Sequence, residues 1–278
     1  VLIPGIGREV KGATRWIGIG TFGFQPSELV KLFIIIFLAY GISRYRDIGR
    51  NTKTIVPYLL ITGAAAGLIL LQPDLGTAFT LSGTLFIMLF AAGYSMGILG
   101  LLAGAGAGLV GLAIALEPYR LSRFLAFLNP WEDPSGAGFH IIQSLYALGS
   151  GGLFGAGLGQ GKQKYLYLPE QHTDFIFAVV GEELGFIGGV LILTLFTIFV
   201  WRGLRIALTA PDPFAGLLAT GITVGIGLQA FINIGVVTGS LPVTGITLPF
   251  ISYGGTSLAF TLIGVGVLLN ISKYAHSR

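Results

Sequence analysis

The sequence predicts an all-α protein that crosses a membrane several times, and three observations lead to this fold class. Hydrophobic residues make up 53% of the 278 residues, while only 10% are charged. The mean hydropathy is +0.83. Several apolar runs approach or exceed the roughly 20 helical residues that a bilayer core of about 30 Å requires. Because irregular backbone cannot face lipid, we expect these runs to form helices.

About seven apolar runs predict membrane spans, and short basic segments orient them, because loops rich in Lys and Arg stay cytoplasmic. Such segments follow the first span (44–53), end the fifth (201–205) and form the tail (273–278). Counting the crossings puts all three on one side, with residues 1–25 and 117–173 outside. The predicted spans are residues 28–43, 55–71, 76–93, 96–116, 174–201, 214–239 and 257–272.

Composition excludes several classes of site. The chain has no cysteine for a disulfide framework, and its three histidines are too scattered to suggest a zinc site. The sequence pI of about 9.4 follows from the orientation signal, so we expect no nucleic-acid partner. No glycine tract has the strand context of a phosphate-binding loop. The glycines within spans predict close helix packing instead; they are Gly104, Gly106, Gly108 and Gly111 in one span, and Gly181, Gly185 and Gly188 in another.

The outer segment 117–173 is too polar to be a lipid-facing helix. It contains a glycine-rich tract from Gly149 to Gly161. Residues 139–148 within it predict a short amphipathic helix at the outer membrane interface. Long loops without regular structure are usually functional. We therefore expect one integral membrane domain, 1–278, with 117–173 as a large extracytoplasmic loop.

Asp174 is the candidate catalytic residue. It follows a polar run and directly precedes a long apolar stretch, so its carboxylate lies where a loop meets the bilayer. An acidic N-cap is common at helix starts, and that structural role accounts for the position equally well. Nearby cations favour a functional role, because they keep a carboxylate ionised and could hold an anionic ligand. These cations are Lys162, Lys164 and His172.

Ionisable residues inside predicted spans are costly and usually functional. Glu28 and Lys31 are three residues apart, so they share a helix face and can neutralise each other. Asp74 marks another helix start, where it could bind a ligand or simply favour the helix dipole. Glu182 and Glu183 lie two turns into the fifth span. We expect them to be buried, paired or protonated packing elements rather than catalysts.

Motifs along the chain resemble the SEDS family of bacterial cell-wall polymerases, which includes RodA, FtsW and SpoVE. Several long motifs in the same order make this resemblance specific. They are KGATRWI at 11–17, QPSEL at 25–29 with Lys31, QPDLGT at 72–77, LPEQHTDFIF at 168–177, EELG at 182–185, LPVTG at 241–245 and LPFISYGGTS at 248–257.

The resemblance implies a bundle of ten spans with both ends in the cytoplasm. The seven spans found here would be the fourth to the tenth. We therefore expect that the chain begins partway through a longer protein and lacks the first three spans. Among the subfamilies we take the chain to be RodA-like, which implies a role in cell elongation and shape.

The resemblance also implies a glycosyltransferase that polymerises lipid II into β-1,4 glycan at the outer face of the bacterial cytoplasmic membrane. The family motif places the essential aspartate at Asp174, as the base for the acceptor hydroxyl. Cations, or a divalent ion held by carboxylates, would meet the charge of the leaving undecaprenyl diphosphate. The sequence leaves that choice open and predicts no specific metal ligands. The candidate substrate-binding residues are Glu28, Lys31, Asp74, Arg120, Arg123, Lys162, Lys164, His172 and Ser252; Arg15 is a further candidate cation.

The implied partners are lipid II, the growing glycan, membrane lipid and a class B penicillin-binding protein that crosslinks the product. A flippase for the same precursor is the alternative from another class, since Glu28 and Lys31 inside a span would suit a translocation path. The sequence lacks the paired interrupted helices typical of inverted repeats, which argues against transport. A scaffold for other wall enzymes would have no need of Asp174.

Overall fold

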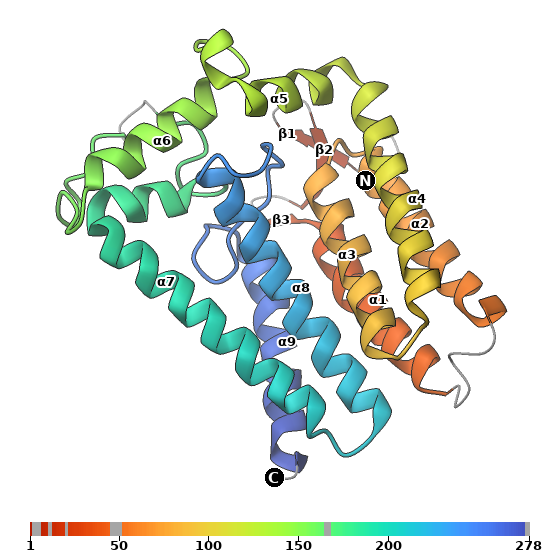
Figure 1. Cartoon of the computed structure of the whole chain (residues 1–278). Helices are drawn as coiled ribbons and strands as arrows, with labels where there is room; N and C mark the ends of the chain where they lie inside the picture. Colours follow the sequence, from red (N-terminus) through yellow and green to blue (C-terminus); the bar gives the residue numbers. More distant parts are fainter. Residues whose placement is uncertain (2–6, 11–12, 20–21, 45–51, 164–167, 276–278) are drawn as a thin grey trace. The chain divides into compact units, whose positions relative to one another are not determined.

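The computed structural model describes residues 1, 7–10, 13–19, 22–44, 52–163 and 168–275. Lys164, most of the basic segment 44–53 and the end of the tail lie outside the described residues. The chain forms two compact units, coloured along the sequence in Figure 1 and described here one at a time. Unit 1 comprises 1–102, 199–228 and 254–278, and unit 2 comprises 103–198 and 229–253. One integral domain stays a prediction.

Unit 1 contains a small sheet and most of the apolar helices. The elements are β1 Gly7–Val10, β2 Ala13–Ile19, β3 Phe22–Phe24, α1 Pro26–Ser43, η1 Thr52–Ile55, α2 Val56–Leu70, α3 Leu75–Ala91, the start of α4 Met96–Ala115, the end of α7 Ile176–Leu208, the start of α8 Pro213–Val237 and α9 Gly255–Tyr274. Pro26 suits the first turn of α1, where its missing N–H costs nothing. The core is tightly packed: a Cβ on Gly221 of α8 would come 2.5 Å from Ile35 and 2.8 Å from Met88.

The sheet is a feature that the sequence analysis missed. Its strands run antiparallel in the order β1-β2-β3, with Ile17 of β2 opposite Gly7 on one side and Phe24 on the other. The strands are short and rich in glycine, which weakens any periodic signal. Thr256 at the start of α9 donates to the Gly23 carbonyl at 3.2 Å, so the sheet is joined to this helix.

The helices confirm the predicted fold class. In the part of the chain that the structure describes, five helices are long and apolar enough to cross a membrane, namely α1, α4, α7, α8 and α9. The shorter apolar helices α2 and α3 occupy the two other predicted spans. In Figure 1 the last turns of α1, α7 and α9 point towards the end of unit 1 opposite its sheet. The ends of these helices adjoin the basic segments that orient the chain.

Unit 2 contains the outer segment and the residues around Asp174. Its elements are the rest of α4, α5 Pro118–Leu128, η2 Pro130–Glu132, α6 Phe139–Gly151, α7 as far as residue 198 and α8 from residue 229. The short helix predicted over 139–148 is confirmed as α6. A further helix, α5, occupies part of the segment expected to be loop.

The predicted span over 174–201 corresponds to α7, but the helix is not continuous: it breaks at Gly185, where φ is +68° and ψ is −165°. Glycine tolerates this conformation because it has no Cβ. The segment 152–157 supplies partners for the interrupted backbone: Ala156 N–H donates to the Glu182 carbonyl at 2.9 Å, and Phe186 N–H donates to the Gly152 carbonyl at 2.8 Å. The part after the break, 186–208, has a length of about 34 Å and is enough to cross a bilayer.

The expected close packing through glycines holds for one span and fails for the other. A Cβ on Gly181 would collide with the Leu148 side chain, so α6 and α7 approach closely there. On α4 the expectation is wrong: a Cβ added at any of the predicted packing glycines would have nothing within 4 Å among the described residues. These are Gly104, Gly106, Gly108 and Gly111.

Candidate functional site

Asp174 lies in a tight turn directly before α7, which begins two residues later at Ile176. The turn is closed by two backbone bonds to the Glu170 carbonyl, from Thr173 N–H at 3.1 Å and from Phe175 N–H at 3.2 Å. Phe175 is buried, with 1% of its surface exposed, and anchors the turn in unit 2. Asp174 itself is half-buried. Its carboxylate therefore belongs to an ordered turn at a helix start, as the sequence predicted.

Three successive carbonyl groups leading up to α7 are held by hydrogen bonds from later parts of unit 2. The Tyr253 N–H donates to the His172 carbonyl at 2.8 Å. The next two carbonyls accept from side chains. The Thr173 carbonyl accepts from Ser252 Oγ at 2.5 Å, and the Asp174 backbone carbonyl accepts from Asn233 Nδ2 at 2.7 Å.

Ser252 was a candidate for substrate binding, and its hydroxyl is occupied within the protein. Besides donating to Thr173, Ser252 Oγ accepts from the Leu248 N–H at 2.7 Å. Asn233 was missed by the sequence analysis. A polar side chain inside an apolar helix is costly unless it is bonded, and that signal could have found it.

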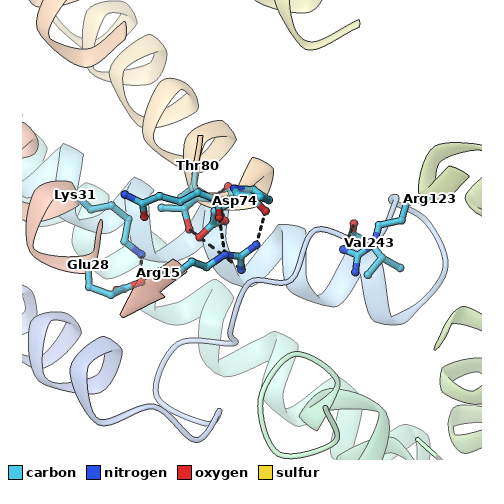
Figure 2. Close-up of polar contacts among 11 residues, drawn as sticks. Arg15, Glu28, Lys31, Asp74, Thr80, Arg123 and Val243 are labelled. Carbon is cyan, nitrogen blue, oxygen red and sulfur yellow. Dashed lines mark hydrogen bonds and ion pairs between the residues drawn. The ribbon is translucent and has the colours of Figure 1, made fainter. Parts of the chain in front are cut away.

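The candidate cations differ in how unit 2 uses them. Arg120 Nη1 donates to the Ala113 carbonyl at 3.1 Å. Arg123 Nη1 lies 3.4 Å from the Val243 carbonyl (Figure 2), and its guanidinium stacks 4.4 Å from the centre of the Tyr119 ring. The side chains of Lys162 and His172 are exposed. Lys162 is therefore the described candidate best placed to meet a soluble anionic group.

Glu182 and Glu183 follow Asp174 along α7 and hold the glycine-rich segment in place. Glu182 is buried, and its carboxylate accepts from the Lys162 N–H at 2.6 Å and from the Gln163 N–H at 3.2 Å. Glu183 accepts from the Gly159 N–H at 3.0 Å. The expected burial of Glu182 is confirmed, and its carboxylate is bonded to backbone N–H groups; that it is not a catalyst stays a prediction.

Unit 1 holds the other polar candidates, and the predicted pair in α1 is confirmed (Figure 2). Lys31 Nζ lies 2.8 Å from Glu28 Oε1, and Glu28 is buried. The ion pair offsets much of the cost of placing two charges in an apolar helix.

Asp74, which the sequence left open between a helix start and ligand binding, serves as the N-cap of α3. Its Oδ1 accepts from the Thr77 N–H at 3.0 Å, and its Oδ2 from Thr77 Oγ1 at 2.9 Å. Arg15 crosses the same turn (Figure 2): its Nη1 lies 3.9 Å from Asp74 Oδ2, and its Nε donates to the Gln72 carbonyl at 3.0 Å. Both side chains are thus engaged in joining β2 to the start of α3.

The donor set does not favour a metal centre. Within the described ranges, no three His, Cys, Asp or Glu side chains come together as ligands of one ion would. The described polar groups form two sets instead. Arg15, Glu28, Lys31 and Asp74 belong to unit 1, whereas Asp174, Arg120, Arg123, Lys162, His172 and Ser252 belong to unit 2.

Comparison with known proteins gives consistent matches. The family model for the FtsW, RodA and SpoVE group, described as "Cell cycle protein", matches residues 1–277. Stage V sporulation protein E of Bacillus subtilis is 54% identical over 282 residues, covering 99% of this chain and 75% of that protein. A probable peptidoglycan glycosyltransferase FtsW of Geobacter sp. strain M18 is 50% identical over 278 residues, covering 98% of this chain and 74% of that protein.

Two solved structures share the fold. A chain of a peptidoglycan synthase complex that coordinates polymerization and crosslinking superposes with a TM-score of 0.81 at 37% identity, covering 99% of this chain and 77% of that chain. Thermus thermophilus RodA superposes with a TM-score of 0.69 at 34% identity, covering 99% and 74%. Relatives named SpoVE and FtsW are thus more similar in sequence than this RodA, and the RodA-like assignment is not confirmed.

Proposed function

The chain belongs to the FtsW, RodA and SpoVE family of multi-pass membrane proteins, and from this premise we propose that it polymerises lipid II as a peptidoglycan glycosyltransferase. The support is the Geobacter relative named as a probable peptidoglycan glycosyltransferase, which is 50% identical over 98% of this chain. The observation that carries the catalytic assignment is the ordered turn that presents Asp174 at the start of α7.

In the proposed reaction the Asp174 carboxylate acts as the general base. It takes the proton from the acceptor sugar hydroxyl as the oxygen attacks the anomeric carbon of the donor. The bond from that carbon to undecaprenyl diphosphate breaks in the same step, and the diphosphate leaves with the electron pair. A single displacement inverts an α-linked donor into a β-linked product.

The leaving diphosphate gains negative charge, and we assign cations of the outer segment to meet it. Lys162 is the leading candidate because its side chain is exposed while its backbone is anchored on Glu182. Arg123 is the second, although its guanidinium already contacts Val243 and Tyr119.

We place this chemistry at the outer face of the cytoplasmic membrane. Asp174 precedes α7, while Arg202 and Arg205 lie in the last turns of the same helix. The intervening part, 186–208, has the length of one bilayer crossing. Basic residues favour the cytoplasmic side, so the carboxylate faces outside.

The proposed partners follow from the same reaction. They are lipid II, the growing glycan, surrounding lipid and a transpeptidase of the penicillin-binding class. The similar synthase complex, which coordinates polymerization and crosslinking, supports the transpeptidase. The orientation signal accounts for the net charge of +4 without a nucleic-acid partner.

The cellular process is a separate proposal. A role in elongation and shape was implied by the RodA-like assignment, whereas the identity of 54% to a stage V sporulation protein and the family description as a cell cycle protein favour a role in sporulation or the cell cycle. Complementation of strains depleted of each paralogue distinguishes these roles, and rescue of rod shape alone would restore the elongation assignment.

The polymerase proposal is tested with purified protein and labelled lipid II. Asp174→Asn should abolish glycan formation while the protein still folds, because the amide cannot accept the proton. Asp212→Asn is the matched control: Asp212 Oδ1 accepts from the Ala215 N–H at 2.9 Å at the start of α8, and an amide oxygen preserves that cap. Normal polymerisation by Asp174→Asn would refute the base. Flipping of lipid II in vesicles without glycan formation would favour the transport alternative.

A further inference from the structure

We propose that Asn233 and Ser252 are positioning residues that fix the direction of the Asp174 carboxylate by holding the backbone around it. The inference rests on the proposed function, in which Asp174 is the base. It concerns unit 2 alone, where α8 and the segment 241–253 contact the turn before α7.

Asn233 is buried in α8, with 1% of its surface exposed. Its Nδ2 donates to two carbonyl oxygens, those of Asp174 and Ile246, each at 2.7 Å. The opposite amide orientation would place Oδ1 against these carbonyl oxygens, so the two hydrogen bonds fix the orientation of the Asn233 amide. One amide group thereby joins the turn of the base to the segment 241–253.

Ser252 repeats this arrangement one residue earlier along the turn. Its Oγ donates to the Thr173 carbonyl at 2.5 Å and accepts from the Leu248 N–H at 2.7 Å. A hydroxyl has one donor and accepts through its lone pairs, so this single group bridges the two segments. The two side chains hold adjacent peptide units on the N-terminal and C-terminal sides of the Asp174 α-carbon.

Holding both peptide units restricts rotation about the backbone of Asp174, and hence the direction in which its side chain leaves the chain. Phe175 is buried on the following residue and limits movement there as well. A base must lie within hydrogen-bond reach of the proton it takes. Misplacement by about 1 Å can reduce turnover about 100-fold. Asn233 and Ser252 therefore affect catalysis through Asp174 without contacting the substrate.

Ser144 provides a control for the loss of a hydroxyl that is bonded within the protein. It has 0% of its surface exposed, and its Oγ donates to the Val237 carbonyl at 2.6 Å, which ties α6 to α8. Ser144→Ala and Ser252→Ala each remove a hydroxyl that donates to a backbone carbonyl, but only the half-buried Ser252 bonds to the turn that contains Asp174. A general loss of packing should affect both variants alike.

The experiment measures kcat and KM for lipid II, with the unfolding temperature of each purified variant. Ser252→Ala and Asn233→Ala should lower kcat about tenfold or more, with KM within about twofold of the unaltered value. Ser252→Thr keeps the hydroxyl and should recover most of kcat. Ser144→Ala should lower the unfolding temperature to a similar degree while kcat stays within about twofold. If Asn233→Ala does not fold, the three serine variants decide the question.

Equal kcat for Ser252→Ala and Ser144→Ala would overturn the inference. A raised KM with unchanged kcat would also overturn it and would make Ser252 a substrate contact. Asp174→Asn separates this failure from failure of the proposed function. If that variant is inactive while both alanine variants keep full kcat, only the positioning role is lost. If Asp174→Asn is active, the base assignment itself is wrong.

Discussion

Lys31 Nζ lies 2.8 Å from Glu28 Oε1, one turn into an otherwise apolar helix. Removing one partner leaves a buried charge without its counter-ion, which typically costs about 3–5 kcal/mol. We therefore expect Glu28→Ala and Lys31→Ala each to lower the unfolding temperature and polymerisation. Thermal unfolding and glycan assays on the same preparations measure both effects.

Exchanging the two charges, Glu28→Lys with Lys31→Glu, separates structure from ligand contact. The exchanged pair should restore folding, but it should not restore polymerisation if Lys31 also contacts lipid II. Recovery of both would assign the pair a structural role alone. Full activity in Lys31→Ala would remove both residues from the proposed site.

The outer cations should respond differently to substitution by Gln. Lys162→Gln should weaken lipid II binding ten- to a hundredfold, the equivalent of a charge-assisted bond of about 1.5–3 kcal/mol, with an unchanged unfolding temperature. Arg120→Gln should instead lower the unfolding temperature, because Arg120 donates to the Ala113 carbonyl. Binding titrations with labelled lipid II and thermal unfolding measure the two effects. Normal affinity in Lys162→Gln would direct the search for the diphosphate contact to Arg123 or Lys164.

Glu182 should matter for stability more than for chemistry. Glu182→Leu leaves the part-buried N–H groups of Lys162 and Gln163 without the carboxylate that binds them, and the lost hydrogen bonds to a charged group lower stability. We expect a lower unfolding temperature and faster proteolysis within 152–163, with Glu182→Gln intermediate. The exposed Glu132→Gln serves as the control. Unchanged proteolysis in Glu182→Leu would show that the segment is held by other contacts.

His140 should make stability depend on pH. Burial, and secondly the positive charge of Arg123, lower the pKa of His140 from its ordinary value of 6.5. The unfolded chain therefore binds the proton at a higher pH than the folded protein does. Above about pH 6.5 the imidazole is neutral in both states and the full free energy of unfolding is present. As the pH falls from there towards the lower folded pKa, the unfolded chain takes up the proton first, so the free energy of unfolding decreases.

Unfolding temperatures between about pH 8 and pH 5 test this expectation. The decrease on acidification should be smaller in His140→Gln than in the unaltered protein. His172→Gln, which changes an exposed histidine, should keep the full decrease. Identical pH profiles for His140→Gln and the unaltered protein would contradict the assignment.

The sequence by itself determined the fold class, the approximate spans and the Glu28–Lys31 pair. Apolar runs must satisfy their backbone groups internally in lipid, so composition and length are sufficient to predict helices there. Side chains three residues apart on a helix meet without help from tertiary structure. The position of Asp174 at a helix start is local in the same sense.

Tertiary structure decided the features that depend on contacts between residues far apart in the sequence. The break at Gly185 is accommodated by the segment 152–157, and local helix propensity contains no information about that partner. Ser252 reaches Thr173 across 79 positions, and Asn233 reaches Asp174 across 59. A buried polar atom binds whichever donor or acceptor the fold brings to it. For that reason the sequence could indicate Asp174 as the proposed base, whereas only the folded chain shows that Asn233 and Ser252 bind the backbone around it.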